Sequence, residues 1–212
     1  MTVTVTSVRA INGGSDIVLS VCLSDGEHSE KRELVLLSRQ YAALRPEKGE
    51  ISEESFDELS EAAEICAAVK RGMNILGYGA CSEKNMRLKL RSKGFGAEVA
   101  ASAAEYLVEL GYINEEKDAE REAERCVGKY WGRRRIAAAL YEKGYSEAAV
   151  RGAIESLGEV DFEGRCVSLI EKKFRGLPED ANEKKKLFAS LLRYGYSPSE
   201  IKNAFYIIES GE

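Results

Sequence analysis

The sequence predicts a mainly α-helical protein in which three tandem three-helix repeats form an extended, curved array behind a small N-terminal β segment. Three observations support this prediction. Apolar residues alternate within the first 50 residues, they recur at helical spacing afterwards, and one glycine-centred motif occurs three times at offsets of 50 and 51 residues. Repeats of this length stack by contact between neighbours, which favours an extended, curved array.

Residues 1–50 are expected to form the β segment. Apolar positions alternate along Ile17–Ser24, turn-forming residues follow at Ser24–Glu27, and Glu33–Leu37 is a candidate return strand. Thr2–Val8 is rich in β-branched residues and can supply a third strand. Because a sheet this small is marginally stable alone, we expect it to pack against a neighbouring helix.

The period changes to that of a helix after Gly49. Ser52 is a candidate N-cap, and Phe56, Leu59 and Cys66 follow it at helical spacing. No convincing strand appears between this point and residue 212. The remaining chain is therefore expected to be helical.

Each repeat is centred on a glycine, because glycine ends a helix in the left-handed conformation at little steric cost. Around that glycine the repeats match at five positions: apolar eight residues before, leucine four before, aromatic one after, alanine nine after, and leucine or isoleucine thirteen after. With Gly94, Gly144 and Gly195 as the anchors, these residues are Met86, Ile136 and Leu187; Leu90, Leu140 and Leu191; Phe95, Tyr145 and Tyr196; Ala103, Ala153 and Ala204; and Leu107, Leu157 and Ile208.

The repeats are expected at residues 51–111, 112–158 and 159–212, each opened by a longer helix. The last helix has the clearest start, because Ser197–Glu200 is a capping box with Pro198 at the first helical position. The acidic pair Glu115–Glu116 favours another helix start, where carboxylates stabilise the positive end of the helix dipole.

The composition favours a binding protein over an enzyme. One histidine, His28, lies in the expected hairpin turn, and the five cysteines include no C-x-x-C pair. No nucleotide-binding or zinc-protease motif is present, so we expect no cofactor, no metal and no catalytic residues. We interpret the cysteines as small buried thiols of a cytoplasmic protein. No stretch approaches the roughly 18 apolar residues of a membrane span, and the N-terminus does not resemble a signal peptide.

The net charge of −5 is distributed unevenly. Residues 1–65 carry 6 basic and 13 acidic side chains, whereas the rest of the chain carries 25 basic and 23 acidic ones. A uniformly basic nucleic-acid-binding surface is therefore excluded, but a local basic face is not.

The strongest candidate contact surface is Lys129–Ile136. It contains Lys129, Tyr130, the only tryptophan, Trp131, and a run of three arginines. Arginine pairs with carboxylates or phosphates, and tryptophan is a frequent interface anchor. The alternative is that Trp131 belongs to the core and the arginines are simply solvated. The two interpretations are about equally supported by the pattern. The arginines of this run are Arg133, Arg134 and Arg135.

A second candidate is the basic helix that contains Arg87, Lys89, Arg91 and Lys93. Arg87 and Arg91 share one face, and Lys89 and Lys93 share another. A solvated amphipathic helix is the more favoured interpretation of this pattern. The runs Lys172–Lys173 and Lys184–Lys186 are weaker candidates, because residues 161–212 balance at 9 basic and 9 acidic side chains.

Taken together, the β segment and the three repeats resemble the RecX family of bacterial recombinase regulators. Gly132–Ile136, Leu140 and the turn Lys143–Tyr145 look like the family's second-repeat motif. Arg91–Phe95 followed by Leu110–Asn114 is similar to the first. The resemblance extends over residues 50–212.

This resemblance implies a non-enzymatic, monomeric partner of the RecA filament. Such a protein would bind in the helical groove of the RecA–DNA filament, reach single-stranded DNA through the filament, and restrain ATP hydrolysis, strand exchange and co-protease activity. The contacts expected are Arg87, Lys89, Arg91, Lys93, Lys129, Tyr130, Trp131, Arg133, Arg134, Arg135 and Lys143. The alternative function is direct DNA binding by three-helix units that act like helix-turn-helix readers. An enzyme with a site built from carboxylates alone is a distant third.

Overall fold

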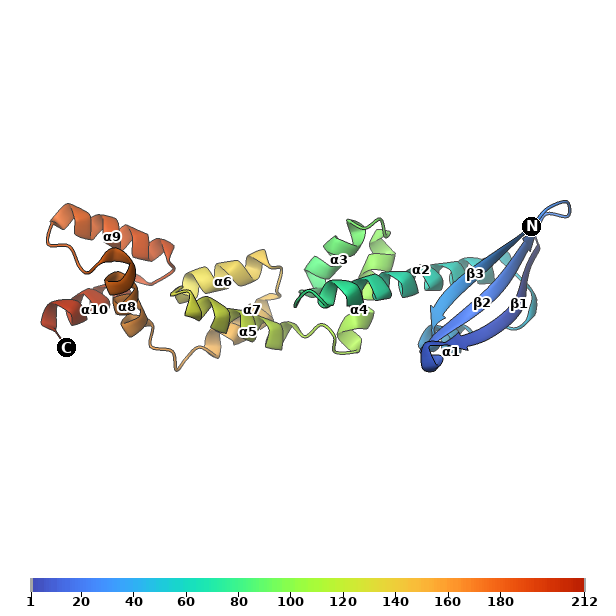
Figure 1. Ribbon diagram of the computed structural model, residues 1–212, viewed down its shortest axis with the longest axis horizontal. Coiled ribbons are helices and arrows are strands. Elements are labelled where there is room, and N and C mark those ends of the chain that lie inside the picture. The colour runs from blue at the N-terminus through green and yellow to red at the C-terminus, as the bar shows by residue number, and fades with distance from the viewer. Residues whose placement is uncertain (1, 212) are drawn as a thin grey trace. The chain divides into compact units, whose positions relative to one another are not determined.

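The computed structural model describes residues 2–211 and begins with a four-stranded antiparallel sheet (Figure 1). Its strands are β1 (Thr2–Ile11), β2 (Asp16–Ser24), β3 (Ser29–Leu37) and β4 (Gly49–Ile51), in the spatial order β3-β2-β1-β4. The expected β segment is confirmed. It contains one strand more than the sequence predicts, β4. This strand has only three residues, too few to establish an alternating pattern.

One helix precedes β4 in the chain, and the other helices follow it. The short helix α1 (Ser38–Leu44) precedes the strand and was not expected from the pattern. The helices that follow are α2 (Glu53–Leu76), α3 (Glu83–Arg91), α4 (Ala97–Glu109), α5 (Glu115–Gly128), α6 (Arg133–Glu142), α7 (Glu147–Glu155), α8 (Phe162–Phe174), α9 (Ala181–Arg193) and α10 (Pro198–Ser210). Ser52 caps α2 as expected, and Ser197 and Glu200 form the expected capping box at α10.

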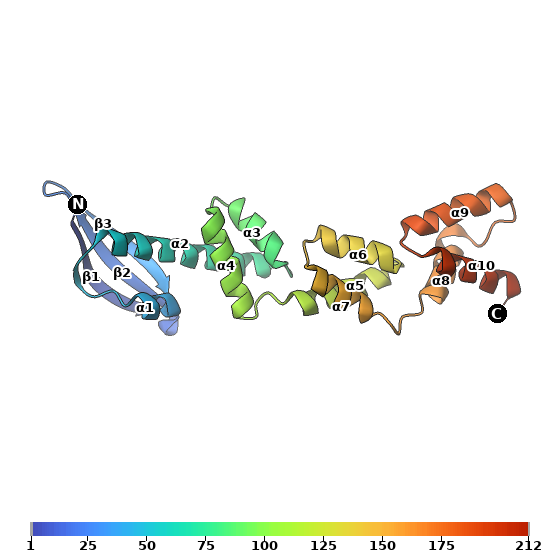
Figure 2. The same cartoon turned by 180° about the vertical axis from the view of Figure 1, so that it is seen from behind.

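The sheet packs one face against α2, which crosses it in both views (Figures 1 and 2). Val5 and Leu19 from the strands share one buried cluster with Leu59 and Ala62 from α2. This confirms that the sheet is covered by a neighbouring helix.

The glycine-centred motif has the same conformation in all three repeats. Gly94, Gly144 and Gly195 have φ values of +96°, +75° and +93°. The backbone N–H of the next residue donates to the carbonyl of the leucine five residues earlier, from Phe95 to Leu90, Tyr145 to Leu140 and Tyr196 to Leu191, at 3.2–3.3 Å. This is the bond that closes a helix in a Schellman turn. The three leucines are fully buried.

The helices around these turns pack in a recurring way. The first and third helices of each group lie against each other, α2 with α4, α5 with α7 and α8 with α10. Together with the N-terminal sheet, this confirms the mainly α-helical fold class. The boundaries 51–111, 112–158 and 159–212 and the curvature of the array stay predictions.

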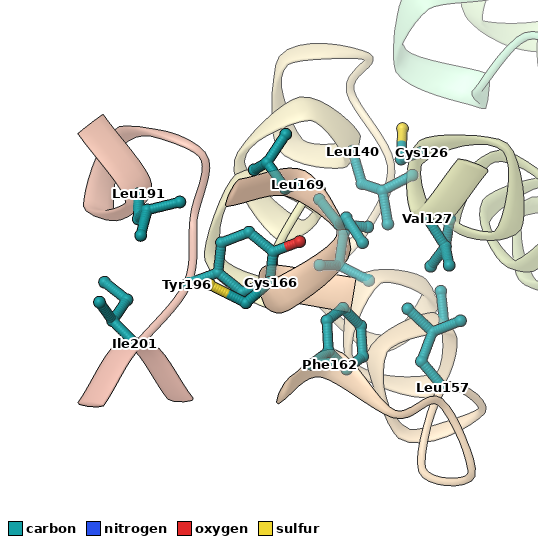
Figure 3. Packing of buried hydrophobic residues seen from close by; sticks show 14 of the residues in the cluster. Cys126, Val127, Leu140, Leu157, Phe162, Cys166, Leu169, Leu191, Tyr196 and Ile201 are labelled. Atoms are coloured by element: carbon teal, nitrogen blue, oxygen red, sulfur yellow. The ribbon is translucent and has the colours of Figure 1, made fainter. Parts of the chain in front are cut away.

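By contacts, the chain divides into two compact units. The first contains residues 1–79 and 86–112, and the second contains 80–85 and 113–212. One buried cluster runs through the second unit from Ala119 to Ala204, and Figure 3 shows Tyr196 beside Cys166 in it. The candidate cations Arg87–Lys93 belong to the first unit, and Lys129–Arg135 belong to the second.

Candidate partner-binding surface

The turn between α5 and α6 holds Tyr130 in an unusual backbone conformation. The Trp131 N–H donates to the Cys126 carbonyl at 3.3 Å, which is the same closing bond as in the glycine turns. Tyr130 occupies the position that glycine holds in those turns, with φ +59°. A side chain in this left-handed region costs about 1–2 kcal/mol. A bulky residue kept at such a cost is a reason to look for a function.

The Tyr130 ring lies close to two cations of α8. Its centroid is 5.3 Å from the Arg165 guanidinium carbon and 5.4 Å from Lys172 Nζ. Lys172 Nζ also donates to the Tyr130 hydroxyl at 2.8 Å, and this bond lowers the pKa of that hydroxyl. The backbone carbonyl of Tyr130 accepts from the Tyr196 hydroxyl at 3.0 Å, which ties the turn to the third repeat.

Trp131 and Tyr194 continue the same alternation of cations and rings. The Trp131 ring lies 5.1 Å from Lys129 Nζ and 4.2 Å from the Arg135 guanidinium carbon. Arg135 is also 5.3 Å from the Tyr194 ring, and Lys173 Nζ is 4.8 Å from that ring and donates to its hydroxyl. Arg135 over the Trp131 ring has the geometry of a cation–π interaction, worth about 0.5–1 kcal/mol at exposed sites, whereas Lys173 meets Tyr194 at its hydroxyl.

We name this set the cation–aromatic cluster. It consists of Tyr130, Trp131, Tyr194, Lys129, Arg135, Arg165, Lys172 and Lys173. Within residues 2–211, none of its five cations forms an ion pair with a carboxylate. The cluster is therefore a positively charged surface whose side chains are held in place by rings instead of by opposite charges.

Backbone contact between two glycines brings the two halves of the cluster together. The Gly132 N–H donates to the Tyr194 carbonyl at 2.8 Å, and the Arg134 N–H donates to the Gly195 carbonyl at 3.2 Å. A Cβ built on Gly132 would lie 2.4 Å from the Gly195 carbonyl carbon. Only glycine at both positions permits this approach, which places Arg135 beside the Tyr194 ring.

The other residues predicted in this region have different surroundings. Arg133 pairs with Glu200 at 2.7 Å and lies 3.9 Å over the Phe162 ring, so it links α6 to the third repeat. Arg134 is exposed. Lys143 Nζ contacts Glu122 Oε1 at 2.6 Å, and the Lys143 carbonyl accepts from Ser82 Oγ at 2.7 Å. Of the predicted residues in this region, Lys129, Tyr130, Trp131 and Arg135 belong to the cluster. Arg133 and Lys143 form ion pairs within the protein, and Arg134 is exposed.

The second predicted set lies on the first compact unit. Arg87, Lys89 and Arg91 are exposed on α3, and Lys93 is exposed in the turn after it. Met86 and Leu90 on the same helix are fully buried, whereas Leu88 is half exposed between the cations. This arrangement is the apolar stripe flanked by charge that the pattern predicts.

Sequence reasoning undervalued four members of the cluster: Arg165, Lys172, Lys173 and Tyr194. The three cations were undervalued because residues 161–212 carry equal numbers of basic and acidic side chains. A net charge does not show which face of a helix a side chain occupies. One signal was available. Arg165 and Lys172 are seven residues apart on α8 and therefore share a helical face.

Two negative findings apply to residues 2–211. No group of three or more histidine, cysteine, aspartate or glutamate side chains is arranged to hold a metal ion. No helix there has the length and hydropathy needed to span a membrane. Four of the five cysteines are buried and all five are free, in agreement with their interpretation as small core thiols.

The fold and the surface define a class: tandem three-helix-repeat proteins with a basic, aromatic surface. Residues 161–205 match the family model for the third three-helix domain of RecX. The regulatory protein RecX of Pelodictyon phaeoclathratiforme is 30% identical over 144 residues, which cover 66% of this chain and 88% of that protein. The chain belongs to the RecX family.

Other relatives agree with this membership. The regulatory protein RecX of Clostridium perfringens strain SM101 is 33% identical over 120 residues, which cover 55% of this chain and 56% of that protein. The chain thus spans little more than half of that relative's length. A crystal structure of a regulatory protein RecX matches with a TM-score of 0.73 at 16% identity, over 98% of this chain and 99% of that one. RecX from Lactobacillus salivarius matches with 0.63 at 23% identity, over 70% and 99%. These two structures show the same fold.

Proposed function

We propose that this chain is a cytoplasmic, monomeric regulator that binds the RecA–DNA filament in its helical groove and inhibits ATP hydrolysis, strand exchange and co-protease activity. The observation that carries the proposal is the cation–aromatic cluster, which offers five cations without carboxylate partners. The regulatory name of the relatives supports a binding role, and none of those relatives is named as an enzyme.

The cluster suits an anionic partner for two physical reasons. Its cations are held by rings, so binding sacrifices less side-chain entropy than it would for freely rotating lysines and arginines. The three lysines and Arg135 keep N–H groups for phosphate or carboxylate oxygens, whereas Arg165 donates to the Val127 carbonyl and contributes mainly its charge. Cations already contact the three aromatic rings. We therefore expect the surface to bind a partner through its charge and not through stacking of these rings on nucleic-acid bases.

The basic face of α3 is the second contact in this proposal. Arg87 and Arg91 would meet the filament on one side of the helix, with Lys89 and Lys93 on the other. Leu88, half exposed, would add an apolar contact between them. Occupation of the groove by both surfaces would obstruct a second DNA strand and the extension of the filament.

The test is RecA-dependent ATP hydrolysis on single-stranded DNA with and without stoichiometric amounts of this protein. We expect inhibition by the natural chain and at least a tenfold higher half-inhibitory concentration for the triple variant Lys129→Ala, Arg135→Ala, Lys172→Ala, as for the loss of a few contacts of about 0.5–1 kcal/mol each. The matched control replaces Lys185 and Lys202, which are exposed cations outside the cluster. Unchanged hydrolysis and strand exchange with the natural chain would refute the proposal.

Direct DNA binding is the second candidate, because the same five cations could neutralise phosphates. It predicts RecA-independent binding to bare duplex DNA that weakens steeply with salt, as condensed counterions are released. Equal affinity for bare duplex and for the filament would favour this candidate. A clear preference for the filament would favour the first.

A further inference from the structure

A cavity of about 470 Å³ opens between the α8–α9 loop and helix α9, outside the cation–aromatic cluster. This volume falls within the range of ligand-binding pockets, about 300–1,000 Å³. Its lining comprises an apolar wall, two cations and two further polar side chains, Glu183 and Ser190. The wall is formed by Phe174, Leu177, Pro178 and Leu187, and the cations are Arg175 and Lys186.

The lining of this cavity is mildly basic, with Arg175 and Lys186 against Glu183. Residues 174–190 as a whole carry 4 basic and 3 acidic side chains. One of the acidic residues, Asp180, is occupied as the N-cap of α9, where its side chain accepts from the Asn182 and Glu183 N–H groups. A partner that enters the cavity therefore meets an excess of positive charge.

Arg175 is held at the cavity in a conformation that arginine seldom adopts. It ends α8 with φ +63°, and Gly176 follows with φ +101°. Glycine, which prefers this conformation, is thus one position away, and the arginine side chain is retained against its backbone preference. Phe174 next to it meets the Tyr194 ring edge-on, with centroids 6.3 Å apart, so the apolar wall is fixed in position.

We infer that this cavity is a docking site for an acidic peptide segment of a partner protein, which inserts one bulky apolar side chain between Leu177 and Leu187. Flanking carboxylates of that segment pair with Arg175 and Lys186. The combination of an apolar pocket with a basic rim is the arrangement that an anchor residue flanked by acids requires. Nucleic acid fits less well, because the apolar wall offers no partner for phosphates and sugars, whereas an apolar anchor side chain of a peptide can be buried against it.

The inference is tested without RecA, so its outcome is independent of the proposed function. The probe is a fluorescein-labelled dodecapeptide of aspartate and glutamate with a central Trp-Leu pair, and the readout is fluorescence polarisation with the full chain. We expect Lys186→Glu to weaken binding at least about tenfold, because it replaces attraction at the pocket rim with repulsion, and Lys185→Glu to change it less than about twofold. Lys185 is the matched control, because it is exposed on the same helix but does not line the cavity.

Two further measurements make the test specific. Ser190→Trp, which fills the cavity from α9, is expected to abolish binding while the thermal midpoint of the chain stays within a few degrees. A peptide in which serine replaces the Trp-Leu pair should bind at least tenfold more weakly, which corresponds to about 1.4 kcal/mol. Equal binding of the serine peptide, equal effects of Lys186→Glu and Lys185→Glu, or equal competition by an oligothymidylate of the same charge would each overturn the inference. So would the absence of peptide binding.

Discussion

Tyr130 shows how one residue can be chosen for its side chain against its backbone preference. It stands where the three repeat turns have glycine, and its ring contacts Arg165 and Lys172. Its φ of +59° is disfavoured for tyrosine by about 1–2 kcal/mol. The contacts with the two cations and the Lys172 hydrogen bond offset part of this cost, so the net effect of the side chain on stability is expected to be small.

Tyr130→Gly separates stability from binding. Relief of the backbone strain is opposed by the greater freedom of glycine in the unfolded chain, so the free energy of unfolding should change by less than about 1 kcal/mol. Inhibition of RecA should decline markedly, because Arg165 and Lys172 lose the ring that orders them. Urea denaturation and the hydrolysis assay measure the two quantities.

The conservative variant Tyr130→Phe provides the control for that experiment. It keeps the ring beside Arg165 and removes the hydroxyl that accepts from Lys172, so the inhibition should lie between that of the natural chain and that of Tyr130→Gly. A loss of more than about 2 kcal/mol of stability in Tyr130→Gly would instead mean that the ring serves the fold.

At the scale of elements, the turn after α9 is constrained by its neighbour as well as by its own conformation. A Cβ on Gly195 would lie 2.4 Å from the Arg135 backbone nitrogen and 2.5 Å from its Cβ. The equivalent turn at Gly94 has nearly the same φ but nothing within 4 Å of the added atom. Gly94 and Gly195 therefore have nearly the same φ but differ in the space available to an added Cβ.

Gly195→Ala and Gly94→Ala form a matched pair on this basis. Both substitutions place alanine in the left-handed region, at a cost of about 1 kcal/mol. Only Gly195→Ala adds an overlap with a backbone atom, which should cost roughly 1–3 kcal/mol more. Chemical denaturation of the two variants measures the difference, and equal losses would show that the glycine contact contributes nothing.

Much of this element structure could be predicted from the sequence. The leucine column and the Ser197 cap rest on local pattern, so Leu90, Leu140, Leu191 and Ser197 have the predicted roles. Helix α1 and strand β4 were missed, because they are too short to establish a period. The cluster could be predicted only in part. Tyr194 and Arg165 join it through tertiary packing at the Gly132–Gly195 contact, which no local pattern encodes.

At the scale of the whole molecule, the two compact units should respond differently to alkaline pH. Burial among acidic neighbours raises the pKa of Tyr145 to about 12, and burial also raises the pKa of Tyr196. Both residues belong to the second unit. An unfolded tyrosine has a pKa of about 10, so between pH 10 and pH 12 the unfolded chain has lost the proton that folded Tyr145 retains. Because the folded chain then binds more protons, the free energy of unfolding falls as pH rises.

This predicts a loss of up to about 1.4 kcal/mol per pH unit for Tyr145 above pH 10, with the full stability present below it. Trp131, the only tryptophan, lies in the second unit, so its fluorescence reports urea unfolding of that unit. Tyr145→Phe should flatten the decline, whereas Tyr141→Phe, at a half-exposed position, should not. Identical pH profiles for the two variants would contradict the prediction.

The junctions between neighbouring helices also limit how such a protein can be rebuilt. Ser82 and Gly132 each stand four residues before a buried apolar residue, Met86 or Ile136, and each donates to the carbonyl that precedes a turn glycine. Ser82 does so with its hydroxyl, and Gly132 with its backbone N–H. The Gly195 turn leaves no room for a side chain at the facing position, but the Gly144 turn accepts the serine at 3.0 Å from an added Cβ. The repeats are therefore not interchangeable modules. A chimaera in which the Ser82 segment faces the third repeat would place a hydroxymethyl group against backbone atoms. Duplication or shuffling of the three-helix repeats therefore has to preserve their order.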